Sequence, residues 1–225
     1  MKHAFVTVIR RPLTAVALGA ALVTCLQACV PVVVGAAAIG TLAAVDRRTL
    51  GSQTDDRSIE LRAEGRAKRV TGDRGRVAAT SYNRTVLLTG EVADDAMKAE
   101  VERQVASIEG IAAIENDLTV APVSTVGARS GDLLITSKVK AAILDTKDLY
   151  VNAFLVHTDR GVVYLMGRVT QREGKLAADV ARNAAGNVKK VVKLFEYISE
   201  DELQSLQSRA APVKEAQPAK KPVAR

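Results

Sequence analysis

The chain has 225 residues, a net charge of +7, two cysteines, two histidines and no tryptophan. This length corresponds to one or two domains, and 48% apolar residues are enough to build a core, which argues against a wholly disordered chain. So few cysteines and histidines speak against a zinc or haem site with several side-chain ligands. An aromatic content of 3% is too low for a platform that binds nucleic acid by base stacking.

Residues 1–28 have the organisation of a secretory signal. Three basic residues among the first eleven precede an apolar run from Leu13 to Val23. The string Leu26-Gln27-Ala28-Cys29 resembles a bacterial lipobox, which implies that Cys29 carries a lipid and becomes the mature N-terminus. Val30 follows the cysteine, and in lipoproteins the absence of aspartate at this position implies the outer membrane, with the protein facing the periplasm. We therefore expect residues 29–52 to form a lipidated tether.

The alternative for this region is a transmembrane anchor. Residues 12–45 carry no charge, and about 20 apolar residues are enough to cross a bilayer. However, Pro31, Gly35 and Gly40 interrupt the second half of the stretch, and a generic helix does not account for Cys29. Residues 30–45 fit either a flexible tether or an apolar collar on the membrane surface.

The positive charge lies outside the body of the chain. The signal contributes +3 and residues 209–225 contribute +4, so residues 29–208 sum to zero. Three prolines alternate with lysine and alanine after residue 209, a composition that buries little surface. We therefore expect residues 200–225 to form a disordered basic tail, and we expect no nucleic-acid partner.

The body contains an internal repeat at an offset of 77 residues. The segment Val86-Leu87-Leu88-Thr89-Gly90-Glu91-Val92 matches Val163-Tyr164-Leu165-Met166-Gly167-Arg168-Val169. Self-similarity at a constant spacing indicates two copies of one structural unit. We place these units at residues 53–122 and 132–199, joined by a linker over residues 123–131.

Each half predicts the same order of elements, α-β-β-α-β. The first helix is expected at 56–68 and 132–144, the hairpin at 76–82/85–91 and 152–158/162–168, and the last strand at 111–120 and 188–198. A second helix with apolar positions at helical spacing precedes each last strand. Gly90 and Gly167 are expected to end the second strands, where a side chain would obstruct the turn. The predicted class is α+β, with two helices on one face of each three-stranded sheet and the strand order left open.

This pattern resembles the BON domain, and the tandem arrangement behind a lipobox resembles the dual BON-domain outer-membrane lipoproteins. The resemblance extends from Cys29 to about Ser199. It implies two domains with mixed sheets, a binding module rather than an enzyme, no cofactor, and support of outer-membrane integrity. It also implies that the second domain engages anionic phospholipid through its first helix.

The residues of the second half agree with lipid binding. Residues 53–122 sum to −3 and residues 132–198 to +4, so only the second half is attracted to an anionic surface. At 100° per residue, Ile135, Val139 and Ile143 share the face that packs on the sheet. A second apolar face, rimmed by two lysines and extended by two residues after the helix, suits insertion among acyl chains. The candidate phospholipid-binding residues are Leu133, Leu134, Lys138, Lys140, Ala141, Leu144, Leu149 and Tyr150.

A member of the dual BON-domain family has an aromatic residue where Leu134 stands in this chain. Leucine keeps the apolar area but lacks the interfacial anchoring of an aromatic ring. The alternative role of the same face is contact with protein: the first domain, a second copy, or the machinery that assembles outer-membrane proteins. The sequence leaves the oligomeric state open.

No residues predict a catalytic or metal site. His157 is the only histidine after the signal, and it lies on a predicted strand with no identifiable catalytic partners. The pairs Asp55-Asp56 and Asp94-Asp95 are expected to cap helix N-termini rather than to bind a cation.

Overall fold

The computed structural model describes residues 46–210. The predicted signal, Cys29, most of the predicted tether and the end of the predicted tail lie outside the described residues. The described residues all belong to one compact unit of the chain. Between residues 46 and 210, no helix is both long enough and apolar enough to cross a membrane.

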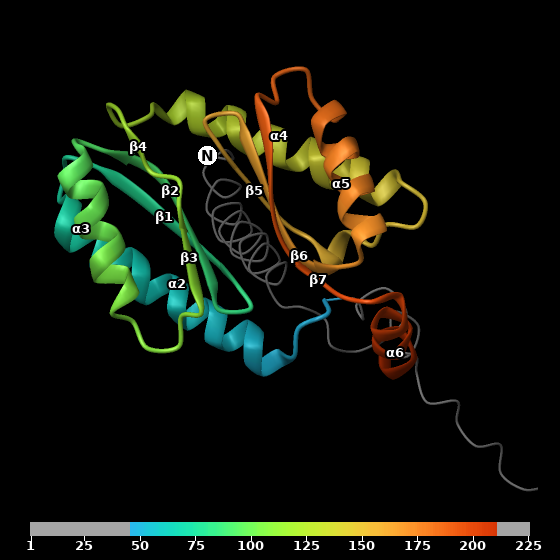
Figure 1. Cartoon of the computed structure of the whole chain (residues 1–225). Coiled ribbons are helices and arrows are strands. Elements are labelled where there is room, and N and C mark those ends of the chain that lie inside the picture. Colours follow the sequence, from blue (N-terminus) through green and yellow to red (C-terminus); the bar gives the residue numbers. More distant parts are fainter. Residues whose placement is uncertain (1–45, 211–225) are drawn as a thin grey trace, which may run out of the picture. The chain divides into compact units, whose positions relative to one another are not determined.

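The first repeat forms a mixed sheet with the hairpin's second strand in the middle (Figure 1). Strand β2 pairs antiparallel with β1 and parallel with β3 and β4. The predicted last strand is interrupted at Asp117 and Leu118, because Leu118 turns into the core and is only 2% exposed. The elements are α2 (Leu50–Thr71), β1 (Arg76–Tyr82), β2 (Thr85–Val92), α3 (Asp95–Ala106), β3 (Ala113–Asn116) and β4 (Thr119–Val120).

The second repeat has the same topology with an unbroken last strand. Strand β6 pairs antiparallel with β5 and parallel with β7, so the sheet order is β5-β6-β7. The elements are α4 (Val126–Asp145), the 3-10 turn η2 (Val151–Ala153), β5 (Leu155–Asp159), β6 (Val162–Val169), α5 (Gln171–Asn183), β7 (Lys190–Tyr197) and α6 (Glu200–Ala210). The predicted α+β class and element order are confirmed, and the strand order is now known.

Both first helices begin earlier than predicted. Helix α2 starts at Leu50, within the predicted tether, and α4 starts at Val126, within the predicted linker. The side chains of Thr49 and Thr125 cap them by accepting backbone hydrogen bonds from Ser52 and Ala128. A capping threonine thus sets each start, whereas the prediction began each helix where the apolar spacing became clear.

The predicted disordered tail is wrong at its start. Residues Glu200–Ala210 form helix α6, in which Leu203 is buried. Glu202 accepts a hydrogen bond of 2.6 Å from the Arg168 guanidinium on β6. One apolar side chain and this ion pair hold α6 against the second repeat, which the composition of the whole tail did not indicate.

The prediction for Gly90 and Gly167 is also corrected. Both lie inside strands, not at their ends. A Cβ atom at Gly90 would lie 2.1 Å from the Arg76 carbonyl oxygen, and one at Gly167 would lie 2.4 Å from the Ala153 carbonyl oxygen. The glycines are therefore required by the close approach of neighbouring backbone.

Each first helix uses one aspartate to hold its hairpin turn. Asp56 accepts hydrogen bonds of 2.8 Å from the backbone N–H groups of both Asn83 and Arg84. Asp132 does the same for Arg160 and Gly161 at 2.9 Å. Asp56 is therefore an interior helix residue and not the predicted cap, because α2 begins six residues before it.

The predicted cap at Asp94 is confirmed. Its side chain accepts a 2.7 Å hydrogen bond from the Met97 N–H at the start of α3. The carboxylate therefore satisfies a free backbone donor in the first turn of the helix.

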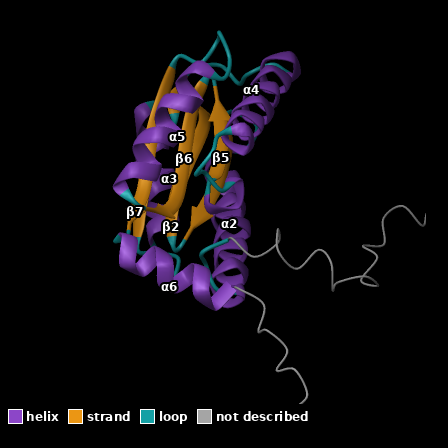
Figure 2. Cartoon of the chain, turned by 90° about the vertical axis from the view of Figure 1, so that its right-hand side faces the viewer, coloured by secondary structure: helices purple, strands orange, loops and turns teal. Residues whose placement is uncertain are grey.

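Helices cover one face of each sheet, and the opposite faces meet each other (Figures 1 and 2). The two helix-side cores are separate clusters, one for each repeat. A third buried cluster joins the repeats through side chains from both sheets. Its buried members are Tyr82, Leu87, Tyr164 and Met166.

Polar contacts surround this shared cluster. The Thr89 hydroxyl lies 2.9 Å from Nε2 of His157, and the Tyr164 hydroxyl donates to Asp117 at 2.5 Å. Burial lowers the pKa of His157, which favours the neutral imidazole at this contact. This contact between Thr89 and His157 thus connects the two repeats.

Candidate membrane-binding face

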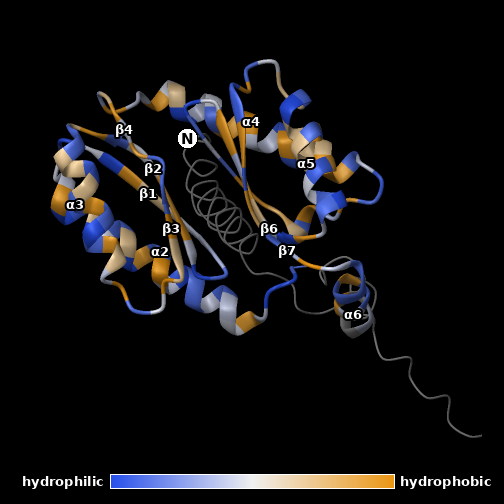
Figure 3. Cartoon of the chain, viewed as in Figure 1, coloured by the Kyte–Doolittle hydropathy of each residue, from blue (hydrophilic) through white to orange (hydrophobic). Residues whose placement is uncertain are grey.

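Helix α4 has two apolar faces, of which only one is buried. Ile135, Val139 and Ile143 are at most 3% exposed and belong to the core of the second repeat. The other face, called here the α4 face, consists of Leu133, Leu134, Ala141 and Leu144. The three leucines are 65–68% exposed, and the alternation of apolar and polar residues along the helix can be followed in Figure 3. A helix that packs on one sheet needs only one apolar stripe, so the α4 face is available to a partner.

Seven of the eight predicted residues are exposed in the structure. Lys138 and Lys140 are exposed and lie at opposite edges of the α4 face, and Tyr150 is 46% exposed just beyond the helix. The lysine stems can therefore lie along apolar surface while the ammonium groups reach outward.

The prediction that Leu149 belongs to the exposed patch is wrong. Leu149 is 7% exposed and packs in the core of the second repeat. The chain turns sharply after α4: Asp148 has a positive φ of 68°, and the Leu149 N–H donates to the Thr146 carbonyl. This turn directs Leu149 inward and leaves Tyr150 exposed.

Sequence reasoning missed Val126, the first residue of α4. It is 70% exposed and precedes Leu133 by seven residues, which is two helical turns, so it extends the α4 face toward the N-terminus. The helical spacing is present in the sequence, but the glycines and serines of this segment favour a linker.

Two serines lie along the α4 face without exposing free donors. The Ser130 hydroxyl donates to the Val126 carbonyl at 3.0 Å, and the Ser137 hydroxyl donates to the Leu133 carbonyl at 2.9 Å. A hydroxyl bonded to its own helix backbone loses less when it leaves water. These serines therefore oppose transfer of the face into an apolar medium less than free hydroxyls would.

The corresponding helix of the first repeat has no such face. Its two exposed leucines are Leu50, at the start of the helix, and Leu61, which lies next to the ion pair between Arg57 and Glu60. The α4 face is thus a property of the second repeat alone, and Leu61 provides a matched control position.

Truncation should separate core leucines from surface leucines. Leu149→Ala is expected to lower the free energy of unfolding by about 2–4 kcal/mol, because it leaves a cavity in the core. Leu144→Ala should change it by less than about 0.5 kcal/mol, since Leu144 is exposed. Urea denaturation followed by circular dichroism measures both, and equal losses would show that Leu144 is also a packed residue.

Residues 46–210 contain no group of three or more histidine, cysteine, aspartate or glutamate side chains placed to hold a metal ion.

The titratable side chains with altered pKa values lie largely where the repeats meet. Burial raises the pKa of Tyr82, and burial together with its hydrogen bond to Asp117 raises that of Tyr164. These shifts accompany structural contacts.

The chain is similar to a known protein family and to two proteins from other bacteria. The BON domain family matches residues 60–122 and 131–199. The chain is 36% identical over 175 residues to the "Outer membrane lipoprotein DolP" of Haemophilus influenzae, covering 77% of this chain and 90% of that protein. It is 30% identical over 156 residues to the "21 kDa hemolysin" of Actinobacillus pleuropneumoniae, covering 68% and 80%.

A solved structure of CdsD, a structural protein of the Type III secretion system of Chlamydia trachomatis, aligns at 10% identity over 64% of this chain and 97% of that one. The TM-score of 0.28 is too low to support a shared overall arrangement.

Proposed function

This chain belongs to the BON-domain family, and from that premise we propose that it is an outer-membrane lipoprotein of the periplasm that binds anionic phospholipid through the α4 face. The lipobox-like string ending at Cys29 and the similarity to a protein named as an outer-membrane lipoprotein support the anchor and the location. By this proposal the protein is a binding module that supports outer-membrane integrity, and it performs no catalysis.

The observation that carries the proposal is the second apolar face of α4, with a lysine on each edge. Each leucine side chain that moves from water into acyl chains contributes about 2 kcal/mol. Leu133, Leu134 and Leu144 are exposed enough to make this transfer without disturbing the core. Tyr150 is exposed just after the helix, and an aromatic ring with a polar tip suits the boundary between headgroups and acyl chains.

The positive charge of the second repeat favours binding to anionic membranes. The second repeat carries +4, and each basic residue near an anionic surface contributes about 1 kcal/mol of attraction. Lys138 and Lys140 are exposed at the level where an inserted α4 face would meet phosphate groups. Attraction of this kind weakens with salt, whereas the apolar contribution persists.

Liposome binding tests the proposal. A protein of residues 46–210 is mixed with vesicles of phosphatidylcholine, with and without phosphatidylglycerol, and bound protein is measured by sedimentation. Wild type should prefer the anionic vesicles. Leu134→Asp or Leu144→Glu should weaken binding at least tenfold, because each removes apolar transfer and adds a charge that must be desolvated.

Leu61→Glu on α2 is the matched control and should bind as wild type, since it changes an exposed leucine outside the α4 face. Unchanged binding of the α4 variants, or equal binding of wild type to both vesicles, would refute the proposal. A photocrosslinker at position 144 in the intact envelope gives an independent result: lipid adducts support the proposal, and adducts confined to a protein indicate an adaptor for envelope assembly.

A further inference from the structure

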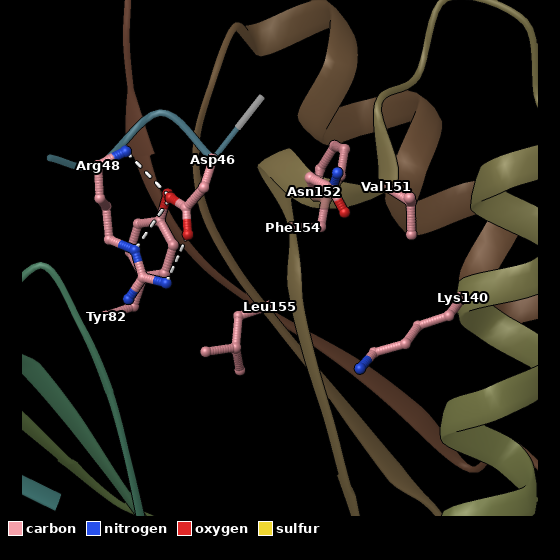
Figure 4. A pocket seen from close by; sticks show the side chains of 8 residues that line it. All are labelled: Asp46, Arg48, Tyr82, Lys140, Val151, Asn152, Phe154 and Leu155. Atoms are coloured by element: carbon pink, nitrogen blue, oxygen red, sulfur yellow. Dashed lines mark hydrogen bonds and ion pairs between the residues drawn. The ribbon is translucent and has the colours of Figure 1, made fainter. Parts of the chain in front are cut away.

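A groove of about 290 Å³ opens beside α4, where the segment before α2 meets the second repeat (Figure 4). One wall comes from the first repeat and its preceding segment, and the other from α4, η2 and β5. The lining residues are Asp46, Arg48, Tyr82, Lys140, Val151, Asn152, Phe154 and Leu155. Lys140 therefore belongs both to the edge of the α4 face and to this groove.

On the first wall, one guanidinium is shared by two carboxylates. The Arg48 guanidinium donates to both carboxylate oxygens of Asp46, at 3.1 and 2.8 Å, and to Asp56 at 2.9 Å. The same guanidinium lies 4.2 Å from the centre of the Tyr82 ring. These contacts hold Arg48 in place, and the Asp46 carboxylate can still accept a further hydrogen bond.

The opposite wall presents a free cation. The Lys140 side chain points from α4 into the groove in Figure 4. Its ammonium has no hydrogen bond or ion pair to any residue between 46 and 210. Because Arg48 is shared between Asp46 and Asp56, Lys140 is the cationic side chain in the lining that is left to bind an anionic group.

The rest of the lining is largely apolar. Val151, Phe154 and Leu155 are its apolar lining residues besides the Tyr82 ring. A site with apolar walls and a few fixed polar groups is typical of small-ligand binding, and a lysine ammonium is a common partner of phosphate.

We propose that this groove receives the phosphate headgroup of an anionic glycerophospholipid whose acyl chains contact the α4 face. Lys140 binds the phosphate, and the Asp46 carboxylate accepts a hydrogen bond from a headgroup hydroxyl. The inference rests on the proposed function and adds to it, because it assigns the headgroup to one side of α4. It predicts that the two edge lysines, which surface attraction alone would make equivalent, differ in effect.

The experiment compares Lys140→Gln with Lys138→Gln in a protein of residues 46–210. Titration with glycerophosphoglycerol, the headgroup without acyl chains, should shift the backbone amide NMR signals of Asn152, Phe154 and Leu155. Lys140→Gln should weaken this binding about tenfold or more, and Lys138→Gln should leave it within about twofold. Among residues 46–210 neither exposed lysine makes a hydrogen bond or an ion pair, so both variants should fold as wild type.

Two controls separate the possible outcomes. Leu134→Asp should keep headgroup binding while losing liposome binding, which distinguishes the groove from the α4 face. If both lysine variants weaken headgroup binding equally, or if inorganic phosphate binds as strongly as the headgroup, the groove proposal is overturned. Liposome binding that depends on Leu134 would still support the proposed function in either case.

Discussion

Gly90→Ala is expected to lower the free energy of unfolding by about 3 kcal/mol or more. The added Cβ would lie 2.1 Å from the Arg76 carbonyl oxygen on the neighbouring strand, a distance that real Cβ atoms do not adopt. The residue also has a φ of 120°, where an L side chain is strained. Relief requires β1 and β2 to move apart, which breaks their hydrogen-bonded register.

Gly65→Ala provides the matched control on α2. The nearest atom to its added Cβ is the Arg69 guanidinium nitrogen at 4.0 Å, and alanine is a better helix former than glycine by about 1 kcal/mol. The same substitution should therefore destabilise at position 90 and stabilise at position 65. Urea unfolding measured on both variants tests this, and a Gly90→Ala protein as stable as wild type would contradict the geometry.

Arg47→Ala is the second large effect, with an expected loss of about 3–5 kcal/mol. The Arg47 guanidinium donates two hydrogen bonds, of 2.7 and 2.8 Å, to the carboxylate of Glu173 at the start of α5. Their side chains are 2% and 1% exposed. Removal of the arginine leaves a buried carboxylate without its partner, and it also removes a link between the segment before α2 and the second repeat.

The pair also predicts a response to pH. Burial by itself would raise the pKa of Glu173, but the hydrogen bonds from Arg47 and from the Thr170 N–H outweigh it and lower the pKa. The resulting stabilisation is present above the pKa of an unfolded glutamate, about 4.3, and is lost as the pH falls through the lowered folded value. Arg47→Ala should therefore differ most from wild type near neutral pH and least in acid.

Arg57→Ala breaks the pair with Glu60 on the surface of α2 and should cost less than about 1 kcal/mol. A double variant, Arg47→Met with Glu173→Leu, should recover much of the stability lost in Arg47→Ala, since no charge remains buried. A loss below about 1 kcal/mol for Arg47→Ala would show that the pair contributes no more than a surface ion pair.

Local pattern was enough to predict several features from the sequence. The offset of 77 residues revealed two copies of one unit, and periodicity indicated which elements each copy contains. The buried stripe Ile135, Val139 and Ile143 and the exposed α4 face were separable because one helix cannot turn both stripes toward one sheet. These properties depend on neighbours a few residues apart, which the sequence displays directly.

Features that depend on contacts between distant residues were missed or misread. The role of Gly90 depends on a strand fourteen residues away, and the burial of Leu149 depends on its packing in the core of the second repeat. Helix α6 was not predicted because the residue that pairs with it, Arg168, lies on β6, 34 residues before Glu202.

By itself, the sequence determined the fold class, the tandem repeat and the surface of α4 that is proposed to meet lipid, because hydrophobic spacing is a local property. Only the tertiary structure decided the strand order, the packing of the two sheets around Tyr82 and Tyr164, and the union of Arg48, Tyr82 and Lys140 in one groove. The physical reason is that hydrogen-bond registers, buried ion pairs and shared cavities are made by residues up to 126 positions apart, and no spacing along the chain reports which of them meet.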